Sequence, residues 1–181
     1  PGRLEELHSK MAAANRLGRY RIEMVSVNAN LVKGEDTIRM LSEIGVVFFG
    51  IGMESLSDRV LKMFKKDVVK FSHIESVVKA AAKLKVTMFG TLVFGFPGET
   101  FADIGDSIAR LDYLRSFNGF LSDGSYVCQP LPGSALWARA YEKGLVSLDM
   151  DFSTLRIDCD SRFLTSQWHY GNEENVPRKD L

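Results

Sequence analysis

The sequence predicts an α/β fold in which parallel strands alternate with helices. Two observations support this fold class. Short apolar segments with the alternating period of a strand are each followed by a segment with helical period. The four strand-like segments begin near residues 20, 46, 86 and 123, so successive starts are 26, 40 and 37 residues apart, which suits strand–helix–strand crossovers. Four such units fit either part of a (β/α) TIM-like barrel or an open doubly wound sheet.

The first segments establish the alternation. The opening 18 residues have a helical period, with Leu4 and Leu7 on one face. Residues 20–27 alternate as a strand. The helix predicted within 34–45 ends at Gly45, because glycine is the residue type that most readily terminates a helix.

The later segments repeat the same order. A strand at 46–51 leads into a helix that begins after Ser55, with Ser55 or Ser57 as its cap. The remaining predicted elements are a helix at 71–84, a strand at 86–94, a helix at 101–115, a strand at 123–129 and a helix after the turn PLPGS. Glu99 and Thr100 are expected to be cap residues of the helix at 101–115. The sheet is therefore expected to contain four strands of this chain.

The composition is that of a globular protein of 181 residues, with 45% apolar and 25% charged residues. The βα pattern ends near residue 150, so we predict a barrel portion over 1–149 and an extension or linker over 150–181. The chain starts with Pro1 inside a helical pattern and lacks the basic and apolar regions of a signal peptide. We therefore expect it to be a piece of a longer chain.

Charge and cysteine content narrow the classes of partner. Lys plus Arg number 23 and Asp plus Glu number 23, so no net field favours nucleic acid or an anionic membrane. The longest apolar runs, such as 46–51, are far shorter than the ~20 residues of a membrane span. Cys128 and Cys159 have no CxxC spacing, and the three histidines are scattered, which excludes a zinc site of the usual spacing. We expect a cytoplasmic protein with a small-molecule substrate and no metal ligands of its own.

The segment Gly50-Ile-Gly52 at the end of the second strand invites comparison with the dinucleotide fingerprint G-x-G-x-x-G/A. Here the third position is Ser55. The candidate ribose-binding acid, Glu75, lies inside a predicted helix instead of ending a strand, and a second helix precedes the next strand. The pattern therefore argues against a dinucleotide site.

Polar residues and glycine turns follow all four predicted strands. They are Asn28 and Asn30 after the first strand, Glu54 and Ser55 after the second, FGFPGE after the third, and Gln129 with PLPG after the fourth. Each set alone fits ordinary turn or cap chemistry. Because parallel α/β folds bind ligands at the carboxyl edge of their strands, the four sets together predict a ligand at this edge.

Three segments resemble the second half of the barrel of radical S-adenosylmethionine (SAM) enzymes. They are LSEIGVVFFGIGMESLSDRVLKMFKKDV, GTLVFGFPGETFADIGDSIARL and YVCQPLPGSALWARAYEKGLV. The branch that they resemble includes methylthiotransferases, the catalytic subunit of elongator, and cobalamin-binding enzymes such as the anaerobic magnesium-protoporphyrin IX monomethyl ester cyclase. The resemblance covers roughly residues 20–146 and implies a partial (β/α) barrel whose N-terminal strands lie outside this sequence.

The resemblance also implies the cofactors. In this family three cysteines of a CxxxCxxC motif hold a [4Fe-4S] cluster, and its fourth iron binds S-adenosylmethionine. Reductive cleavage then yields a 5'-deoxyadenosyl radical for oxidation or methylation of an organic substrate. Cobalamin is a further cofactor of some members. This sequence contains no CxxxCxxC motif, so the family pattern implies that these 181 residues alone are inactive. Tetrapyrrole, tRNA and lipid substrates fit the branch equally.

By the same resemblance, particular residues contact S-adenosylmethionine. Glu54 and Ser55 match the polar pair after the family's fourth strand, and Asn28 matches the polar residue that ends its third. Lys66 falls where relatives place a basic residue suited to the carboxylate of the cofactor. Phe94, Gly95 and Phe96 match the edge around adenine, and Gln129 matches the end of the family's sixth strand, near adenine or substrate.

Two other function classes stay open at this point. One is a barrel enzyme that binds phosphate at a helix N-terminus, and the other is a βα scaffold or interaction domain without chemistry of its own. In a partial barrel the strand at 20–27 is an unpaired edge, which predicts association through that edge.

Overall fold

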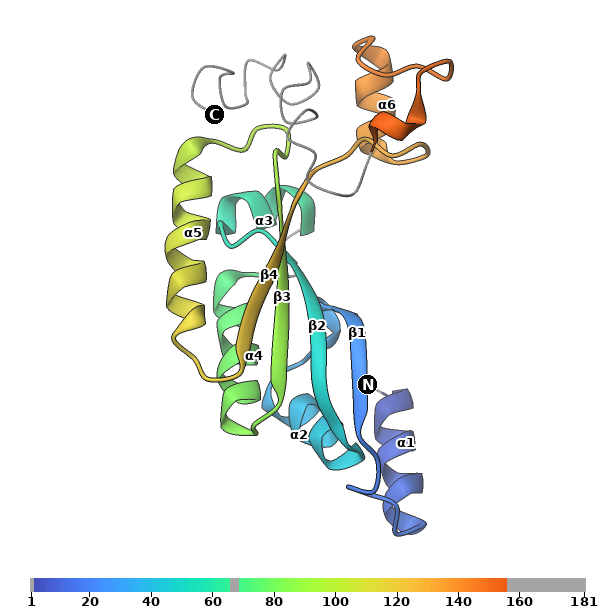
Figure 1. The fold of residues 1–181 in the computed structure, drawn as a ribbon, viewed down its shortest axis with the longest axis vertical. Coiled ribbons are helices and arrows are strands. Elements are labelled where there is room, and N and C mark those ends of the chain that lie inside the picture. The colour runs from blue at the N-terminus through green and yellow to red at the C-terminus, as the bar shows by residue number, and fades with distance from the viewer. Residues whose placement is uncertain (1, 66–68, 156–181) are drawn as a thin grey trace. The chain divides into compact units, whose positions relative to one another are not determined.

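The computed structural model describes residues 2–65 and 69–155, and strands alternate with helices along this part of the chain as predicted (Figure 1). The chain divides into two compact units. The first unit consists of Pro1–Leu92 and Asp106–Gly124, and the second of Val93–Gly105 and Ser125–Leu181. Most of the extension predicted at 150–181 lies outside the described residues, so its boundary stays a prediction.

The four strands form one sheet in the order β1-β2-β3-β4, in which β1 pairs with β2, and β2 with β3, in parallel. The strands are β1 (Ile22–Asn28), β2 (Val46–Glu54), β3 (Thr87–Phe94) and β4 (Phe120–Val127). The helices are α1 (Gly2–Ala13), α2 (Glu35–Ile44), α3 (Asp58–Lys65), α4 (Phe71–Lys83), α5 (Phe101–Arg115) and α6 (Ala135–Glu142), with short 3-10 turns η1 (Ala29–Leu31) and η2 (Phe152–Thr154). The order places β1 at an edge of the sheet, as predicted for the strand at 20–27. Association through that edge stays a prediction.

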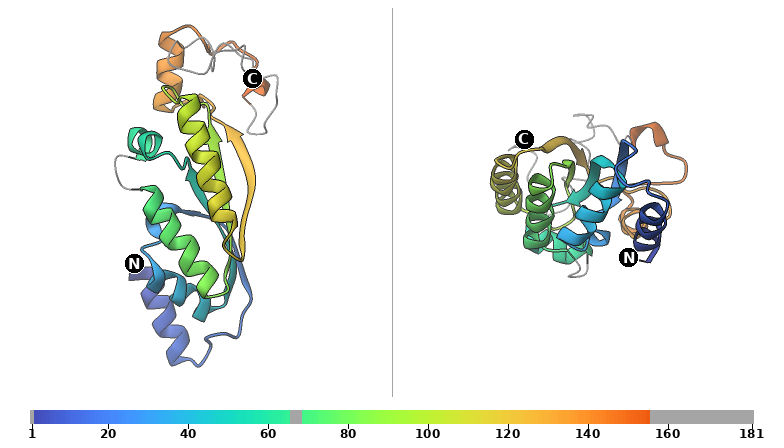
Figure 2. Two further views of the ribbon diagram at one scale, coloured as in Figure 1. Left: turned by 90° about the vertical axis from the view of Figure 1, so that its left-hand side faces the viewer. Right: turned by 90° about the horizontal axis from the view of Figure 1, so that it is seen from below.

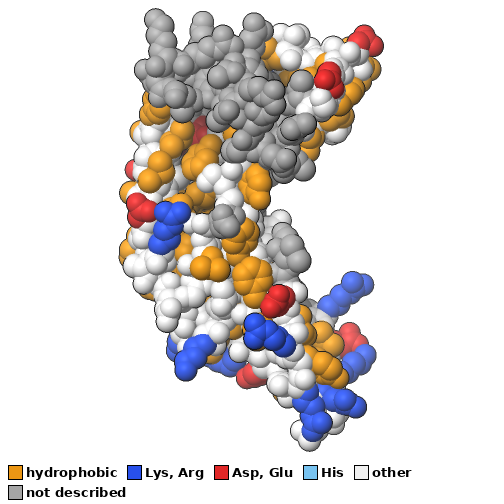
Figure 3. Space-filling model, in the orientation of Figure 1, with side chains coloured by type: hydrophobic (Ala, Val, Ile, Leu, Met, Phe, Trp, Pro, Cys, Tyr) orange, Lys and Arg blue, Asp and Glu red, His pale blue; other side chains and the backbone are white. Residues whose placement is uncertain are grey.

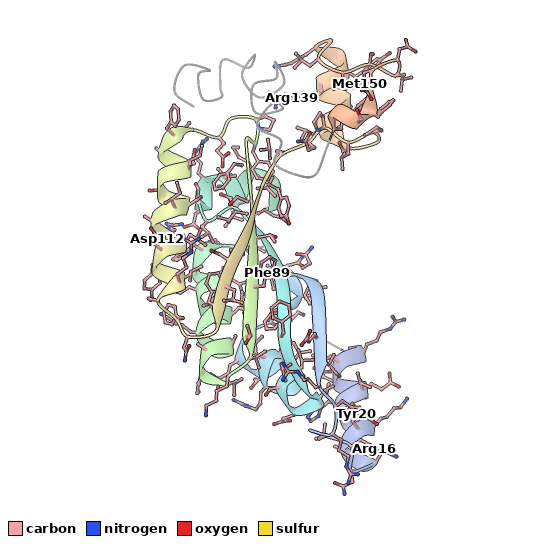
Figure 4. The ribbon with its side chains drawn as sticks, viewed as in Figure 1. Arg16, Tyr20, Phe89, Asp112, Arg139 and Met150 are labelled. Atoms are coloured by element: carbon pink, nitrogen blue, oxygen red, sulfur yellow. The ribbon has the colours of Figure 1, made fainter. Side chains whose placement is uncertain are left out.

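The core of the first unit lies between the sheet and a layer of helices. Figure 2 shows α2, α4 and α5 on one face of the sheet. Phe49, Ile51 and Met53 of β2 are buried, as expected for alternate residues that face this helical layer. On the opposite face the rings of Phe48 and Phe89 lie 6.4 Å apart, and apolar side chains gather over the middle of the sheet (Figures 3 and 4).

Gly45 ends α2, as predicted, by adopting the left-handed conformation. Its φ is 114°, and its N–H donates to the carbonyl oxygens of Leu41 and Ser42. A Cβ atom at this position would meet the backbone carbonyl of Tyr20. Position 45 therefore requires glycine for two independent reasons.

Two strands, β2 and β4, differ from their predicted bounds by three residues at one end. The strand predicted at 46–51 continues to Glu54, because Gly52 and Glu54 still pair with Thr91 and Leu92 of β3. Strand β4 begins at Phe120 instead of residue 123, because the chain already joins the sheet where the Met88 N–H donates to the Gly119 carbonyl oxygen at 2.8 Å. Both errors arise from pairing between distant segments, which local periodicity does not report.

The second unit contains a small core of its own around α6. The hydroxyl of Ser134 caps this helix by accepting the Trp137 N–H at 3.0 Å. Trp137, Ala140 and Val146 are buried together with Leu155, and the Trp137 ring stacks on Phe152 with centroids 5.9 Å apart. The first residues of the predicted extension therefore pack against α6.

Candidate cofactor-binding site

In the first unit, the carboxyl ends of β1 and β2 bring two predicted site residues to neighbouring strands. Asn28, the last residue of β1, pairs in register with Gly52 of β2. Asn28 is exposed, and its side-chain oxygen accepts the Asn30 N–H at 3.4 Å. This places a side-chain amide at the strand edge where α/β folds bind ligands.

Glu54 ends β2 in an unusual backbone conformation. Its φ is 62°, and the pairing register shifts between Gly52 and Glu54. The carboxylate lies over Gly52, since a Cβ at Gly52 would come within 2.8 Å of Oε1 of Glu54. A left-handed conformation costs a residue other than glycine roughly 1–2 kcal/mol, and such strain concentrates at functional sites. Glu54 is therefore the strongest candidate for a ligand contact in this unit.

Ser55 is oriented differently from its neighbour Glu54. Its side chain is buried, its Oγ accepts the Ser57 N–H at 3.1 Å, and it lies 3.3 Å from Oγ of Ser107 in α5. The Ser55 hydroxyl thus holds the turn before α3. Ser57 caps α3, as predicted, because its hydroxyl oxygen accepts the Val60 N–H at 3.4 Å. The cofactor contact predicted for Ser55 stays a prediction.

Three side chains that sequence reasoning missed hold the turns after β1 and β2. Ser107 accepts N–H groups from Leu56 and Ser57, and Arg110 donates to the Leu56 carbonyl oxygen. His73 of α4 contacts the carbonyl oxygen of Ala29, the residue after Asn28, at 3.0 Å. These partners lie 44 to 54 residues apart, so no local motif could have identified them.

In the second unit, the turn after β3 contains Phe94, Gly95 and Phe96. Gly95 has φ 82°, and its N–H donates to Oε2 of the buried Glu99 at 2.6 Å. The Phe94 carbonyl oxygen accepts the Cys128 N–H at 2.7 Å, and that of Phe96 accepts the Glu99 N–H at 2.9 Å. Glu99 therefore closes this turn on itself, a role that the sequence did not predict.

Thr100 caps α5, as predicted. Its N–H and hydroxyl both donate to Oδ2 of Asp103, at 2.9 and 2.6 Å, and its hydroxyl oxygen accepts the Asp103 N–H at 3.3 Å. This reciprocal arrangement is a capping box with aspartate in place of glutamate.

Gln129 follows β4 in the second unit and carries an unsatisfied acceptor. Its Oε1 atom is buried and accepts no hydrogen bond from the residues that the structure describes. Leaving a buried acceptor unpaired costs roughly 1–3 kcal/mol. Its amide therefore suits a ligand that brings an N–H or O–H donor. Lys66, the remaining predicted contact, lies outside the described residues.

The comparison with protein families decides the affiliation of these 181 residues. The model described as the radical SAM superfamily matches residues 3–111. The chain belongs to the radical SAM superfamily. Enzymes of this superfamily use S-adenosylmethionine together with a [4Fe-4S] cluster, as the resemblance of the three segments implied.

The radical SAM chain is similar to two curated enzymes named tRNA-2-methylthio-N(6)-dimethylallyladenosine synthase. The enzyme from Trichlorobacter lovleyi is 30% identical over 81 residues, which are 43% of this chain and 17% of that enzyme. The enzyme from Hydrogenovibrio crunogenus is 30% identical over 87 residues, 45% of this chain and 17% of that enzyme. The chain thus matches less than a fifth of the length of these relatives.

Solved structures show the fold of the radical SAM chain. The methyltransferase TsrM from Kitasatospora setae, solved with cobalamin and a [4Fe-4S] cluster, gives a TM-score of 0.64 at 16% identity and covers 96% of this chain and 35% of that chain. Coproporphyrinogen III oxidase (HemN) from Escherichia coli, a radical SAM enzyme, gives a TM-score of 0.51 at 16% identity over 61% of this chain and 24% of that chain. These matches confirm the predicted partial TIM-like barrel.

The residues of this radical SAM chain do not fit the iron–sulfur cluster itself. The sequence contains two cysteines, fewer than the three that a CxxxCxxC motif supplies, and Cys128 is buried. Among the described residues no three His, Cys, Asp or Glu side chains are grouped to hold a metal ion.

No helix in the part of the chain that the structure describes has the length and apolar character needed to cross a bilayer.

Proposed function

We propose that this chain supplies part of the S-adenosylmethionine-binding edge of a radical SAM enzyme whose cluster cysteines come from residues outside this sequence. The observation that carries the proposal is the strained Glu54, whose carboxylate lies over Gly52 beside Asn28. Strain of this kind persists where a ligand site needs the geometry. When bound, S-adenosylmethionine supplies the 5'-deoxyadenosyl radical of this superfamily.

The chemistry of the candidate residues suits the cofactor. The carboxylate of Glu54 accepts hydrogen bonds, which suits hydroxyl and amino donors of S-adenosylmethionine, and the Asn28 amide both donates and accepts. The buried acceptor of Gln129 suits the amino group of adenine. Phe94 to Phe96 offer backbone edges and apolar surface next to the Gly95 turn. We assign Lys66 to the carboxylate of the cofactor on the family pattern alone.

Phosphate binding at a helix N-terminus receives less support. In the first turns of α3, α5 and α6, the N–H groups of Val60, Asp103 and Trp137 donate to the hydroxyl oxygens of Ser57, Thr100 and Ser134. Carboxylates also stand in the first turns of α3 (Asp58) and α5 (Asp103), where they would repel a phosphate. A scaffold without chemistry would not need the strained carboxylate at Glu54.

The proposal names no substrate, because the relatives differ. The names of the two curated relatives specify a modified tRNA adenosine, and TsrM was solved with tryptophan as substrate. Three expectations stay predictions: a small-molecule substrate, which includes the possibility of a tetrapyrrole; cobalamin as a second cofactor; and a cytoplasmic location.

The test compares the anaerobically reconstituted full-length protein with the 181-residue chain. We expect four irons and 5'-deoxyadenosine release only in the full-length protein, and a rise in the S-adenosylmethionine Kd of about tenfold or more for Glu54→Gln, since a charged hydrogen bond contributes roughly 1.5–3 kcal/mol. Glu43→Gln, at the other end of the first unit, is the matched control. Absence of iron in the full-length protein, or unchanged cofactor affinity of Glu54→Gln, would overturn the proposal.

A further inference from the structure

We propose that His73 is a positioning residue that fixes the turn carrying Asn28 and thereby sets the affinity for S-adenosylmethionine; this inference rests on the function proposed above. His73 lies in the first turn of α4, and its Nε2 atom is 3.0 Å from the carbonyl oxygen of Ala29. A carbonyl oxygen only accepts hydrogen bonds, so the imidazole donates from Nε2–H.

Two local hydrogen bonds within the turn after Asn28 are long. Asn28 caps η1 through its side-chain oxygen, which accepts the Asn30 N–H at 3.4 Å, and the Val32 N–H reaches the Ala29 carbonyl oxygen at 3.3 Å. Both distances exceed the usual range for an N–H···O bond, whereas the 3.0 Å bond from His73 lies within it. The shortest of these three hydrogen bonds therefore comes from α4, 44 residues along the chain.

The first turn of α4, which carries His73, is held in place by contacts with α3 and α5. The Phe71 N–H donates to Oδ1 of Asp58 at 2.7 Å, and Arg110 of α5 binds Oδ2 of the same carboxylate at 3.1 Å. The Arg110 guanidinium also stacks over the Phe71 ring, 4.5 Å from its centroid. These contacts join α3, α4 and α5 at Phe71, two residues before His73. The backbone that carries His73 is therefore held in place, and the imidazole in turn fixes the carbonyl group of Ala29.

The hydrogen bond from His73 affects ligand binding through Asn28, the residue before Ala29. Its partner in the sheet is Gly52, over which the Glu54 carboxylate lies. The exposed amide of Asn28 donates to no oxygen among the described residues, which leaves its two N–H groups for a ligand. Holding Ala29 fixes the backbone that carries this amide, and a preorganised contact binds more tightly than a mobile one.

The experiment measures the S-adenosylmethionine Kd of the full-length reconstituted protein by equilibrium dialysis, with melting temperatures alongside. His73→Leu is expected to raise the Kd about 2- to 10-fold, the range of one ordinary hydrogen bond. His73→Gln is expected to restore affinity, because its amide N–H reaches the position of Nε2. His8→Leu, on α1, is the control. Wild-type affinity in His73→Leu, or no rescue by glutamine at equal melting temperature, would overturn the inference.

A double-mutant cycle tests whether His73 acts through Asn28. In an Asn28→Ala background, His73→Leu is expected to cause no further loss of affinity. An independent loss in that background would contradict the inference. If the wild-type protein binds no S-adenosylmethionine, the proposed function fails, and hydrogen exchange of the Asn30 and Val32 amides still decides the role of His73. Faster exchange in His73→Leu than in His73→Gln supports the anchor, and equal exchange refutes it.

Discussion

The Oγ atom of Ser107 in α5 accepts the backbone N–H of Ser57 at 3.1 Å, across 50 residues of sequence. The same oxygen accepts the Leu56 N–H at 3.3 Å. A serine of the helix after β3 therefore holds the turn that follows β2, and this turn begins directly after the strained Glu54.

Ser107→Ala should lower the free energy of unfolding by about 1–3 kcal/mol, because it removes the hydroxyl acceptor of the buried Leu56 N–H and leaves the Ser57 N–H with Ser55 Oγ alone. Ser116→Ala removes an exposed hydroxyl that donates to the Tyr113 carbonyl oxygen and should change stability by less than about 0.5 kcal/mol. Urea denaturation followed by circular dichroism measures both variants. Equal effects of the two substitutions would show that the buried capping bond contributes little.

Gly45→Ala should destabilise the first unit by more than about 1 kcal/mol, because φ is 114° and the new methyl group meets the Tyr20 carbonyl. Gly105→Ala is a matched control inside α5, where a Cβ would meet no atom within 4 Å. There alanine should stabilise the helix by roughly 0.5–1 kcal/mol. Thermal melts of both variants should shift in opposite directions, and a downward shift for both would contradict this account.

Glu54→Gly should raise stability while it lowers cofactor affinity. Glycine adopts φ 62° without the steric cost that Glu54 bears. We expect a gain of up to about 1 kcal/mol in unfolding free energy, together with the affinity loss predicted for Glu54→Gln. Melting temperature and the S-adenosylmethionine Kd should therefore move apart. A variant that is less stable than the wild type would show that Glu54 is retained for folding instead of binding.

Glu75 makes the stability of the contact between α4 and α5 depend on pH in the acid range. Oε1 of Glu75 accepts hydrogen bonds from Nζ of Lys79 at 2.6 Å and from the Tyr113 hydroxyl at 2.7 Å. These two bonds lower the pKa of Glu75 below its ordinary value of 4.5, and the bond from Lys79 has the larger effect. A lowered pKa means that the contribution to stability is present above pH 4.5 and is lost as the pH falls through the lowered value. NMR titration should place the pKa of Glu75 below 4.5 in the wild type and nearer 4.5 in Lys79→Met. Equal values in both would exclude this cause.

Much of the fold was predictable because its signals are local. The glycine that ends α2, the serine before α3 and the threonine before α5 were all identified from residue type and position, and each caps or ends a helix as predicted. The end of β2 and the start of β4 were wrong because pairing with β3 extends both strands beyond their periodic segments.

The candidate site was predictable only in outline. Asn28 and Glu54 were placed at the correct strand ends, because parallel strands bring their carboxyl ends to one edge. The sequence treated Glu54 and Ser55 as a pair, whereas the structure directs the hydroxyl of Ser55 to Ser107. The supports from His73 and Ser107 could not be predicted, because their bonds join residues that are 44 or more positions apart.

The stacking of Trp137 on Phe152 has a practical consequence for spectroscopy. Trp137 belongs to the second unit, whereas the ranges of the first unit, Pro1–Leu92 and Asp106–Gly124, include no tryptophan. The fluorescence of Trp137 therefore reports on the second unit, while the unit that contains Asn28 and Glu54 has no tryptophan to report its unfolding. In this chain an emission change on heating and a loss of far-ultraviolet ellipticity are readings of different parts of the molecule, and their midpoints need not coincide.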